Sequence, residues 1–316
     1  SSLGEDEFDE SRLRCLAVGG LIERDRLEEA LEVAATIRDP FWNGNAGYRI
    51  VEGLAFAGRN AEAMDLAESY VEDSKPIALA AAAAGFARSG RFDDAGEVGA
   101  RIDHIYWFEQ AMADTAAALF AAGDESEALE MARSLTDSHL KSVTEAKIAE
   151  IAFQAGHEDL GISIALSVED DCTRVELFVK LSSFKEDELS MDLLLSAYQE
   201  ARDSTELMVY NSSAQLIAKG FAKRGEWEHA WSVVNTIDHN YAQSLAAAEL
   251  ITLDPSFLLS DTQEVWENIL ARFCGRRRTD MILATPVLAA ILAKSTGPHA
   301  GLALFEVLRE VRTEWP

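Results

Sequence analysis

The sequence predicts an all-α protein, a right-handed α-solenoid of about nine helix-turn-helix repeats with a period near 33 residues. Two observations predict this fold. First, an Asp recurs at positions 39, 73, 103, 137, 170, 203 and 238, with separations of 34, 30, 34, 33, 33 and 35 residues. Second, each interval holds two helical stretches separated by a turn signal, and no segment alternates like a strand.

The repeats divide the chain into a tail, a repeat region and an end region. Residues 1–9 are predicted to form an acidic N-terminal tail, residues 10–253 the repeats and residues 254–316 irregular C-terminal capping helices. Terminal units of a stack are often atypical, because they must cover its core. The predicted first helices of the nine pairs span 8–24, 41–57, 75–89, 104–122, 138–155, 171–184, 205–224, 239–252 and 279–294.

The turn inside each pair is predicted from a residue that suits left-handed backbone at the end of the first helix. Asp25 takes this place in the first unit, and five later units have Gly58, Gly90, Gly123, Gly156 and Gly225. Several second helices are also expected to begin with capping boxes, in which an Asp precedes a Glu by three residues. These are Asp25 with Glu28, Asp124 with Glu127 and Asp261 with Glu264.

The second helices carry small residues four positions apart, which allow a neighbouring helix to approach. The pairs are Ala30 and Ala34, Ala63 and Ala67, Ala95 and Gly99, Ala128 and Ala132, Gly161 and Ala165, and Ala197 and Ala201. The first helices carry a Phe near their ends, and these rings are predicted to lie in the core. They are Phe56, Phe86, Phe120, Phe153 and Phe221.

The period, the helix-turn-helix form and the phrase from Gly225 to Ala230 resemble tetratricopeptide repeats over roughly residues 10 to 250. In the second helices of this chain, a small residue stands four positions after the first small residue and a large apolar residue stands seven positions after it. The tetratricopeptide family has the reverse order, so the repeats are called tetratricopeptide-like. The ending from Arg278 to Pro316 is similar to the closing segment of bacterial repeat proteins that finish in Trp-Pro. The resemblance implies a bacterial protein-binding role, often beside signalling or defence modules.

The charge limits the possible partners. Asp and Glu number 55 against 28 Lys and Arg, giving a net charge of −27. Such a chain repels phosphates, so nucleic acid is not an expected partner. The acidity is explained either by adaptation to salt or solubility, or by a negative face that meets a basic partner. The absence of a signal peptide pattern and of an 18-residue apolar run predicts a cytoplasmic protein with no membrane partner.

No pattern for catalysis, a cofactor or a metal is found. Phosphate-binding Gly motifs and paired His motifs are missing, and the three cysteines at 15, 172 and 274 form no Cys-x-x-Cys pair. Asp103-His104 and Asp238-His239 occupy the same corner between units, and we interpret them as turns. No enzyme activity, cofactor or metal is therefore expected.

A set of cations gives the candidate binding site. Counted from the recurring Asp, Lys141 and Arg174 stand at plus four, and Arg49, Lys147 and Lys180 stand at plus ten. Because equivalent residues of consecutive repeats stack side by side, Lys141 with Arg174 and Lys147 with Lys180 are predicted to form two basic rungs. The alternative is that each cation only neutralises a nearby Glu. A second basic cluster contains Arg276, Arg277 and Arg278.

The sequence thus favours a non-enzymatic scaffold or docking module that binds a peptide or protein segment in the concave groove of the first helices. The partner would carry an acidic segment or a basic patch, and the chain would be a monomer or weak dimer. The alternative function is a sensor or regulatory subunit of a bacterial signalling or defence assembly that responds to a ligand or peptide.

Overall fold

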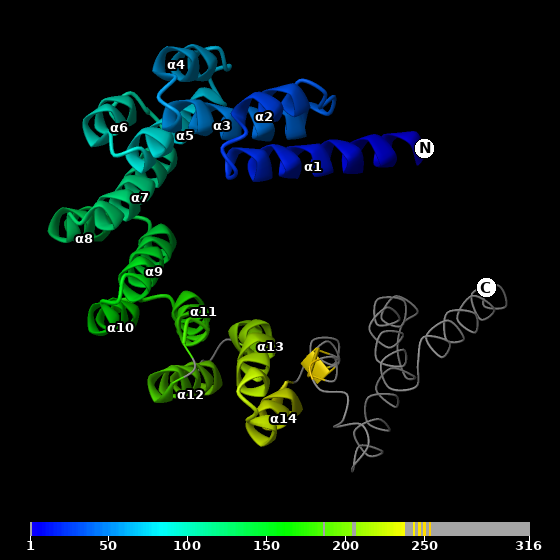
Figure 1. Cartoon of the computed structure of the whole chain (residues 1–316), viewed down its shortest axis with the longest axis vertical. Coiled ribbons are helices and arrows are strands. Elements are labelled where there is room, and N and C mark those ends of the chain that lie inside the picture. The colour runs from blue at the N-terminus through cyan, green and yellow to red at the C-terminus, as the bar shows by residue number, and fades with distance from the viewer. Residues whose placement is uncertain are drawn as a thin grey trace. The chain divides into compact units, whose positions relative to one another are not determined.

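The computed structural model describes residues 2–185, 187–203 and 207–237, together with residues 243, 246, 247, 249, 250 and 253. In these residues the secondary structure is helical, with 14 helices and no strand (Figure 1). The protein is therefore all-α as predicted. The ninth predicted pair and the capping helices of residues 254–316 lie outside the described residues, and of the predicted first helix 239–252 only residues 243, 246, 247, 249 and 250 are described, as helix.

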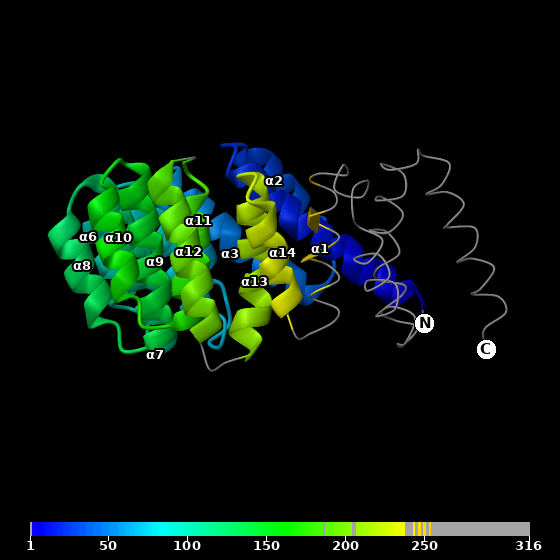
Figure 2. The same cartoon turned by 90° about the horizontal axis from the view of Figure 1, so that it is seen from below.

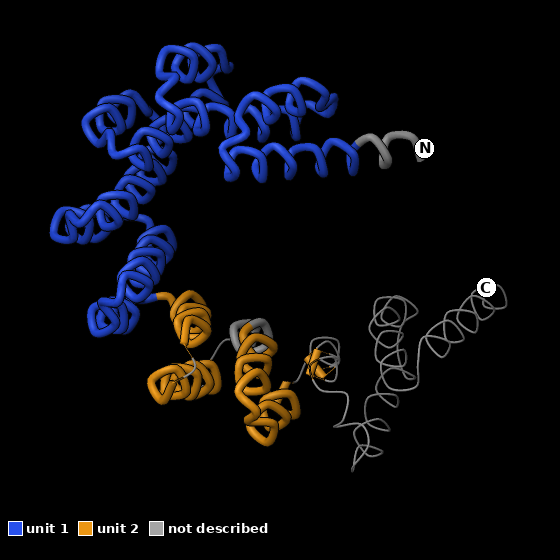
Figure 3. Tube along the Cα trace, in the orientation of Figure 1, with its two compact units in different colours: residues 1–169 blue, residues 170–316 orange. Residues whose placement is uncertain are grey.

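The chain divides into two units, residues 1–169 and 170–316 (Figure 3). The helices of unit 1 are α1 Ser2–Ile22, α2 Leu27–Ala34, α3 Pro40–Phe56, α4 Asn60–Glu68, α5 Lys75–Arg88, α6 Phe92–Gly99, α7 Ile105–Ala122, α8 Glu125–Ser134, α9 Ser138–Gln154 and α10 Glu158–Ser167. Those described in unit 2 are α11 Asp171–Ser182, α12 Glu188–Asp203, α13 Leu207–Lys223 and α14 Trp227–Thr236. The predicted ends of the first helices from 41 to 224 fall within two residues of these bounds.

Within unit 1 the first helices of the pairs pack on one another in chain order. Helix α3 packs on α1 and α5, and α7 packs on α5 and α9. Each second helix packs on the first helix of its own pair, and the pairs α7–α8 and α9–α10 lie next to each other (Figure 2). Each pair thus buries its apolar faces only against its neighbours in sequence, as expected of helical repeats.

The N-terminal residues differ from the prediction of a tail up to residue 9. Helix α1 begins at Ser2. Two causes explain this difference. Acidic residues are favourable in the first turns of a helix, because the free backbone N–H groups there carry partial positive charge. In addition, the Phe8 ring packs edge-on against Trp42 of α3, with 5.6 Å between centroids, which ties this part of α1 to the second pair.

The turns inside the pairs follow the prediction. Asp25 has φ 58°, and all five predicted glycines have positive φ. The backbone then folds back, as where Arg59 N–H donates to the Leu54 carbonyl at 2.9 Å and Asp124 N–H to Leu119 at 3.0 Å. These bonds satisfy carbonyls at the end of the first helix, so the turn needs no side-chain support.

The predicted capping boxes are wrong where the structure describes them. The N-cap residue of α2 is Arg26, because Asp25 is already used in the left-handed turn, and it makes no side-chain cap bond. Asp124 is the N-cap of α8, but its ψ of 60° departs from extended backbone and its side chain makes no cap bond either. Asp261 lies outside the described residues.

At three of its positions the recurring Asp begins a pair and does not close one, whereas Asp203 is the last residue of α12. Three of these side chains accept the backbone N–H three residues later, at the start of a first helix. The bonds join Asp39 to Trp42 at 3.0 Å, Asp137 to Leu140 at 2.8 Å and Asp170 to Thr173 at 2.7 Å. Each of these Asp residues has extended backbone, the usual N-cap conformation.

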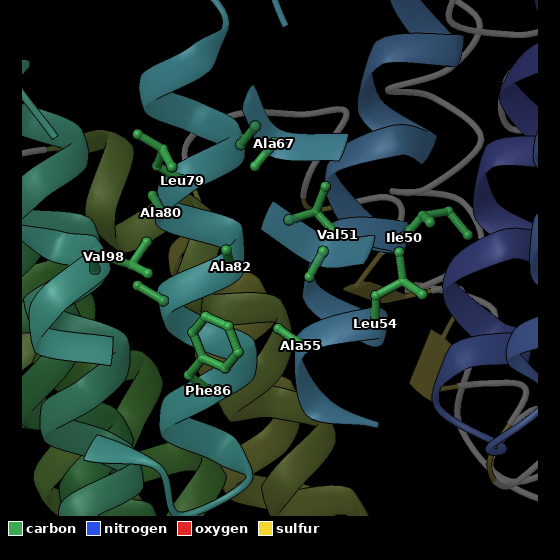
Figure 4. Close-up of a cluster of buried hydrophobic side chains, with 14 of the residues drawn as sticks. Ile50, Val51, Leu54, Ala55, Ala67, Leu79, Ala80, Ala82, Phe86 and Val98 are labelled. Atoms are coloured by element: carbon green, nitrogen blue, oxygen red, sulfur yellow. The ribbon is translucent and has the colours of Figure 1, made fainter. Parts of the chain in front are cut away.

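The core of the first three pairs is built from small residues and a few large ones. Ala55 of α3 lies close to Ala82 and Phe86 of α5 (Figure 4). Most of the paired small residues of the second helices are buried, including Ala63, Ala67, Ala128 and Ala132. Of the five predicted core rings, Phe86, Phe120, Phe153 and Phe221 are buried.

Phe56 is the exception and the prediction for it is wrong, because its side chain is exposed. It is the last residue of α3, where the neighbouring α5 presents a cation. The guanidinium of Arg88 lies over the Phe56 ring, 5.1 Å from the centroid, and also pairs with Glu52 at 2.6 Å. The ring therefore serves as a cation–π partner at the surface.

Candidate binding surface

The five candidate cations that the structure describes fall into two groups with different surroundings. Lys141 and Arg174 stand four residues after an N-cap Asp, and Arg49, Lys147 and Lys180 stand ten residues after one. The remaining candidates, Arg276, Arg277 and Arg278, lie outside the described residues.

The two cations at plus four are held by carboxylates of their own unit. Lys141 Nζ lies 3.2 Å from Glu169 Oε1, and the Lys141 side chain is 25% exposed. Arg174 is 20% exposed and bonds Glu200 at 2.5 Å and Asp171 at 2.6 Å. These side chains link helices to neighbouring segments, so they match the alternative in which the cation neutralises nearby acids.

The three cations at plus ten are exposed. Lys147 is 53% exposed, and its Nζ lies 3.0 Å from Asp114 Oδ1 of α7. Lys180 is exposed on α11. Arg49 is exposed on α3 and reaches across to α1, where a Cβ added at Gly19 would lie 2.7 Å from its guanidinium. Among the described residues Arg49 makes no ion pair.

The predicted basic rungs each join a residue of unit 1 to a residue of unit 2, and the structure describes each unit by itself. Inside unit 1 the structure instead brings Asp114 and Lys147 together at equivalent positions of α7 and α9. Sequence reasoning missed Asp114 because it counted from Asp103. The N-cap of α7 is the next residue, His104, and Asp114 stands ten residues after it. The residues ten positions after the N-caps of the first helices therefore include both cations and an anion.

Sequence reasoning also missed exposed apolar side chains at the starts of α3 and α7 and in the turn before α5. They are Phe41, Val71, Ile105 and Tyr106. The corners before α5 and α7 are adjacent, because Glu68 pairs with both Lys75 and Arg101. Phe41 packs edge-on against Trp42 and Tyr106 against Trp107, each at 5.0 Å between centroids. Both aromatic pairs stand two and three residues after the N-cap of a first helix. This common position in the repeat is the sequence signal that would have identified them.

Two further kinds of site concern metal ligands and a reactive thiol. No group of three or more His, Cys, Asp or Glu side chains is placed to hold a metal in this part of the chain. Burial raises the pKa of the Cys15 thiol, although Arg49 opposes this, so the reactive thiolate form is disfavoured. Asp103 and His104 are exposed at the corner before α7. In addition, none of the described helices is long and apolar enough to cross a membrane.

Comparisons with known proteins add little to this picture. No family model matches the chain, and no curated protein does. Among solved structures it is similar to Ton1535 from Thermococcus onnurineus NA1, with 14% identity over 90% of this chain and 91% of that chain and a TM-score of 0.33. A likeness at this level supports no statement about function, so the proposals below rest on the chain itself.

Proposed function

We propose that this chain is a non-enzymatic docking scaffold, a right-handed solenoid of about nine tetratricopeptide-like pairs. Its first helices line a groove that binds an acidic or carboxylate-bearing segment of another protein. The observation that carries the proposal is the exposure of the cations at plus ten, Arg49, Lys147 and Lys180, on three first helices of a chain with net charge −27.

The first helices bury most of their surface but keep one face open to solvent. In α9, Ile148, Ala149 and Ala152 are fully buried, while Lys147 and Val143 are exposed. Equivalent faces of α3 and α7 carry Arg49 and Asp114. Cations that remain at the surface of so acidic a protein would be the groups that meet a carboxylate of a partner.

The ion pair between Lys147 and Asp114 does not prevent this use. Exposed pairs stabilise a protein by only about 0–1 kcal/mol, so a partner carboxylate can replace Asp114 at little cost. The cations at plus four are less suitable, because Lys141 and Arg174 are already held at partly buried positions. The proposed site therefore excludes them.

The test is a selection of peptides from a random display library on the immobilised protein. Acidic peptides should be enriched, and their affinity should fall as salt rises. The double variant Arg49→Glu/Lys147→Glu should bind the selected peptide at least about tenfold more weakly, because it reverses both contacts.

The matched control is Arg38→Glu/Arg133→Glu, which makes the same charge change at exposed sites outside the first helices. It should bind nearly as well as the unmodified protein, and all three proteins should melt at similar temperatures. Selection of basic peptides, or equal loss of binding in both double variants, would show that the first-helix cations are not the site.

A further inference from the structure

Three aromatic side chains of α1 and α3 contact one another, and two of them are exposed. The two helices pack side by side (Figure 1). Phe8 lies edge-on against Trp42, with 5.6 Å between centroids, and Phe41 lies edge-on against the same ring at 5.0 Å. Phe8 and Phe41 are 44% and 62% exposed. The Trp42 indole N–H is buried and has no acceptor in the described part of the chain. Solvent thus contacts an aromatic surface that also contains an unused hydrogen-bond donor.

Two arginines border these rings. On α1, residues 8, 12, 15 and 19 follow at intervals of four, three and four, so they share one side of the helix. That side faces α3, because Phe8 contacts Trp42 and a Cβ added at Gly19 would lie 2.7 Å from the Arg49 guanidinium of α3. Arg12 is exposed on this side, between Phe8 and Gly19, and Arg49 is exposed two turns after Trp42. Both cations therefore lie along the border between α1 and α3, next to the rings.

Neither Arg12 nor Arg49 has a carboxylate partner among the described residues, in a chain with 55 Asp and Glu against 28 Lys and Arg. Glu10, two residues before Arg12, is bonded by Arg14 at 2.6 Å on the side of α1 where Arg14 also bonds the Thr36 carbonyl. Other arginines of unit 1 bond a carboxylate as well, namely Arg26, Arg59, Arg88, Arg91 and Arg101. Two cations without such a partner, beside exposed rings, favour an anionic group from another molecule.

We propose that Phe8, Arg12, Phe41, Trp42 and Arg49, which we call the α1–α3 patch, bind a large apolar side chain that stands next to acidic residues in a segment of another protein. This inference rests on the proposed function, whose site includes Arg49, and it names the chemistry that the segment must carry. The two arginines stand one and two helical turns beyond the rings, about 5 and 11 Å along the helix axes. An extended segment rises about 3.3 Å per residue, so acids within about three residues of the apolar side chain reach both arginines.

Helix α7 repeats the aromatic pair without the cations and gives an internal comparison. Tyr106 lies edge-on against Trp107 at 5.0 Å between centroids. These residues follow the N-cap of α7 by two and three positions, as Phe41 and its neighbour do in α3. The position of Arg49, ten residues after the N-cap, holds Asp114 in α7. An acidic segment meets repulsion there, so Tyr106 is the matched control for Phe41.

The test is fluorescence anisotropy of labelled synthetic peptides titrated with the full chain. The first peptide has a central phenylalanine with two aspartates on each side, and a dissociation constant on the order of 100 µM is expected for so small a contact. One comparison peptide replaces the phenylalanine by alanine, and another replaces the aspartates by lysines. Each should bind at least about tenfold more weakly, because the first loses the contact with the rings and the second reverses the charge. Equal affinity for the phenylalanine and alanine peptides overturns the proposal.

Variants of the protein locate the contact. Phe41→Ala and Arg12→Glu should each weaken binding of the phenylalanine peptide at least about fivefold. The controls Tyr106→Ala and Arg133→Glu make the same changes at exposed sites outside the α1–α3 patch and should leave the affinity unchanged. Circular dichroism and melting temperature check the folding of each variant.

The remaining outcomes separate this inference from the proposed function. Loss of peptide binding in Lys147→Glu but not in Arg12→Glu overturns the α1–α3 patch and leaves the groove of the proposed function in place. Loss in Arg12→Glu alone supports the patch and removes Lys147 from the site. Displacement of the peptide by adenosine monophosphate at a lower concentration than by unlabelled peptide assigns the patch to a nucleotide and overturns the proposal.

Discussion

The carboxylate of Glu109 on α7 accepts the backbone N–H of Asp137, the N-cap residue of α9, at 3.0 Å. The same carboxylate accepts the N–H of Thr136 at 3.0 Å and its hydroxyl at 2.5 Å. Glu109 is only 4% exposed. Ser11 stands in the same relation to Asp39, 28 residues away, with Asp39 N–H donating to its hydroxyl at 3.4 Å. A polar side chain of one first helix thus holds the start of the next.

Glu109→Ala should destabilise the protein by about 2–3 kcal/mol, because it leaves two backbone N–H groups and a hydroxyl without their acceptor in a mostly buried place. Urea unfolding at pH 7, followed by circular dichroism, measures this loss. Glu97→Ala removes an exposed carboxylate from α6 and should change stability by less than about 0.5 kcal/mol. Equal effects of the two substitutions would mean that Glu109 does not hold the start of α9.

The same contacts predict how the stabilisation depends on pH. The hydroxyl of Thr136 lowers the pKa of Glu109, and the two N–H groups add to this against the opposing effect of burial. A carboxyl with a lowered pKa in the folded state stabilises fully above its unfolded value of about 4.3, and the stabilisation is lost as pH falls through the folded pKa. The difference between the unmodified protein and Glu109→Gln should therefore shrink on acidification below about pH 4.

The positions of the first helices were predictable because their signals are local. A glycine in left-handed backbone ends each of several first helices, and an Asp at even spacing marks the corner between pairs. The spacing could not show whether Asp39 closes one pair or begins the next, since both give the same period. The hydrogen bond to Trp42 decides it. The N-cap of α7 is His104, one residue after Asp103. Counting from Asp103 therefore did not identify Asp114 as the residue ten positions after the N-cap.

The surroundings of the site residues were not predictable, because they depend on contacts between helices. Lys141 and Lys147 look alike in sequence, yet one faces Glu169 at a partly buried place and the other is half exposed beside Asp114. Phe56 looks like a core ring and lies under Arg88 at the surface. Leu13 and Leu16 follow the apolar pattern of a packed helix, but no described helix covers them. The repeat period and the amino-acid composition do not tell which face of a helix contacts a neighbouring helix.

Gly85 of α5 should not tolerate a side chain. A Cβ at this position would lie 2.3 Å from the backbone oxygen of Glu52 and 2.7 Å from Ala55 Cβ on α3. Gly85→Ala therefore forces α3 and α5 apart and should cost about 1–3 kcal/mol. Gly96→Ala is the control, because nothing lies within 4 Å of its added Cβ in α6. That change should stabilise the protein by about 0.5–1 kcal/mol, since alanine favours helix. Thermal unfolding of both variants measures the opposite signs.

Arg174 and Lys147 should differ in their contribution to stability. Arg174→Ala removes a mostly buried guanidinium that bonds Glu200 and Asp171, and should cost about 1–3 kcal/mol. Lys147→Ala removes an exposed cation with one partner, Asp114, and should cost at most about 1 kcal/mol. Urea unfolding at low and moderate salt compares them. A larger loss at Lys147 than at Arg174 would contradict the division between structural and exposed cations.

Glu145 on α9 is a buried carboxyl without full hydrogen bonding. It is 6% exposed, and its Oε2 has no hydrogen-bond partner. Burial raises its pKa. Lys141 and Arg133 oppose this rise, and Glu169 adds to it. The ionised form is therefore disfavoured in the folded protein, in contrast to Glu109, whose oxygens are all bonded.

Glu145→Gln should make the protein more stable at pH 7, because it replaces a poorly solvated carboxylate by a neutral group of the same shape. A carboxyl with a raised folded pKa contributes its stabilisation below the unfolded pKa of about 4.3 and loses it as pH rises through the folded value. The gain of the variant should therefore be present at pH 7 and vanish near pH 4. Urea midpoints across this range measure it, with Glu130→Gln on the exposed side of α8 as the chemically matched control. A variant less stable than the unmodified protein at pH 7 would instead mean that the attraction of the Glu145 carboxylate to Lys141 outweighs the cost of its burial.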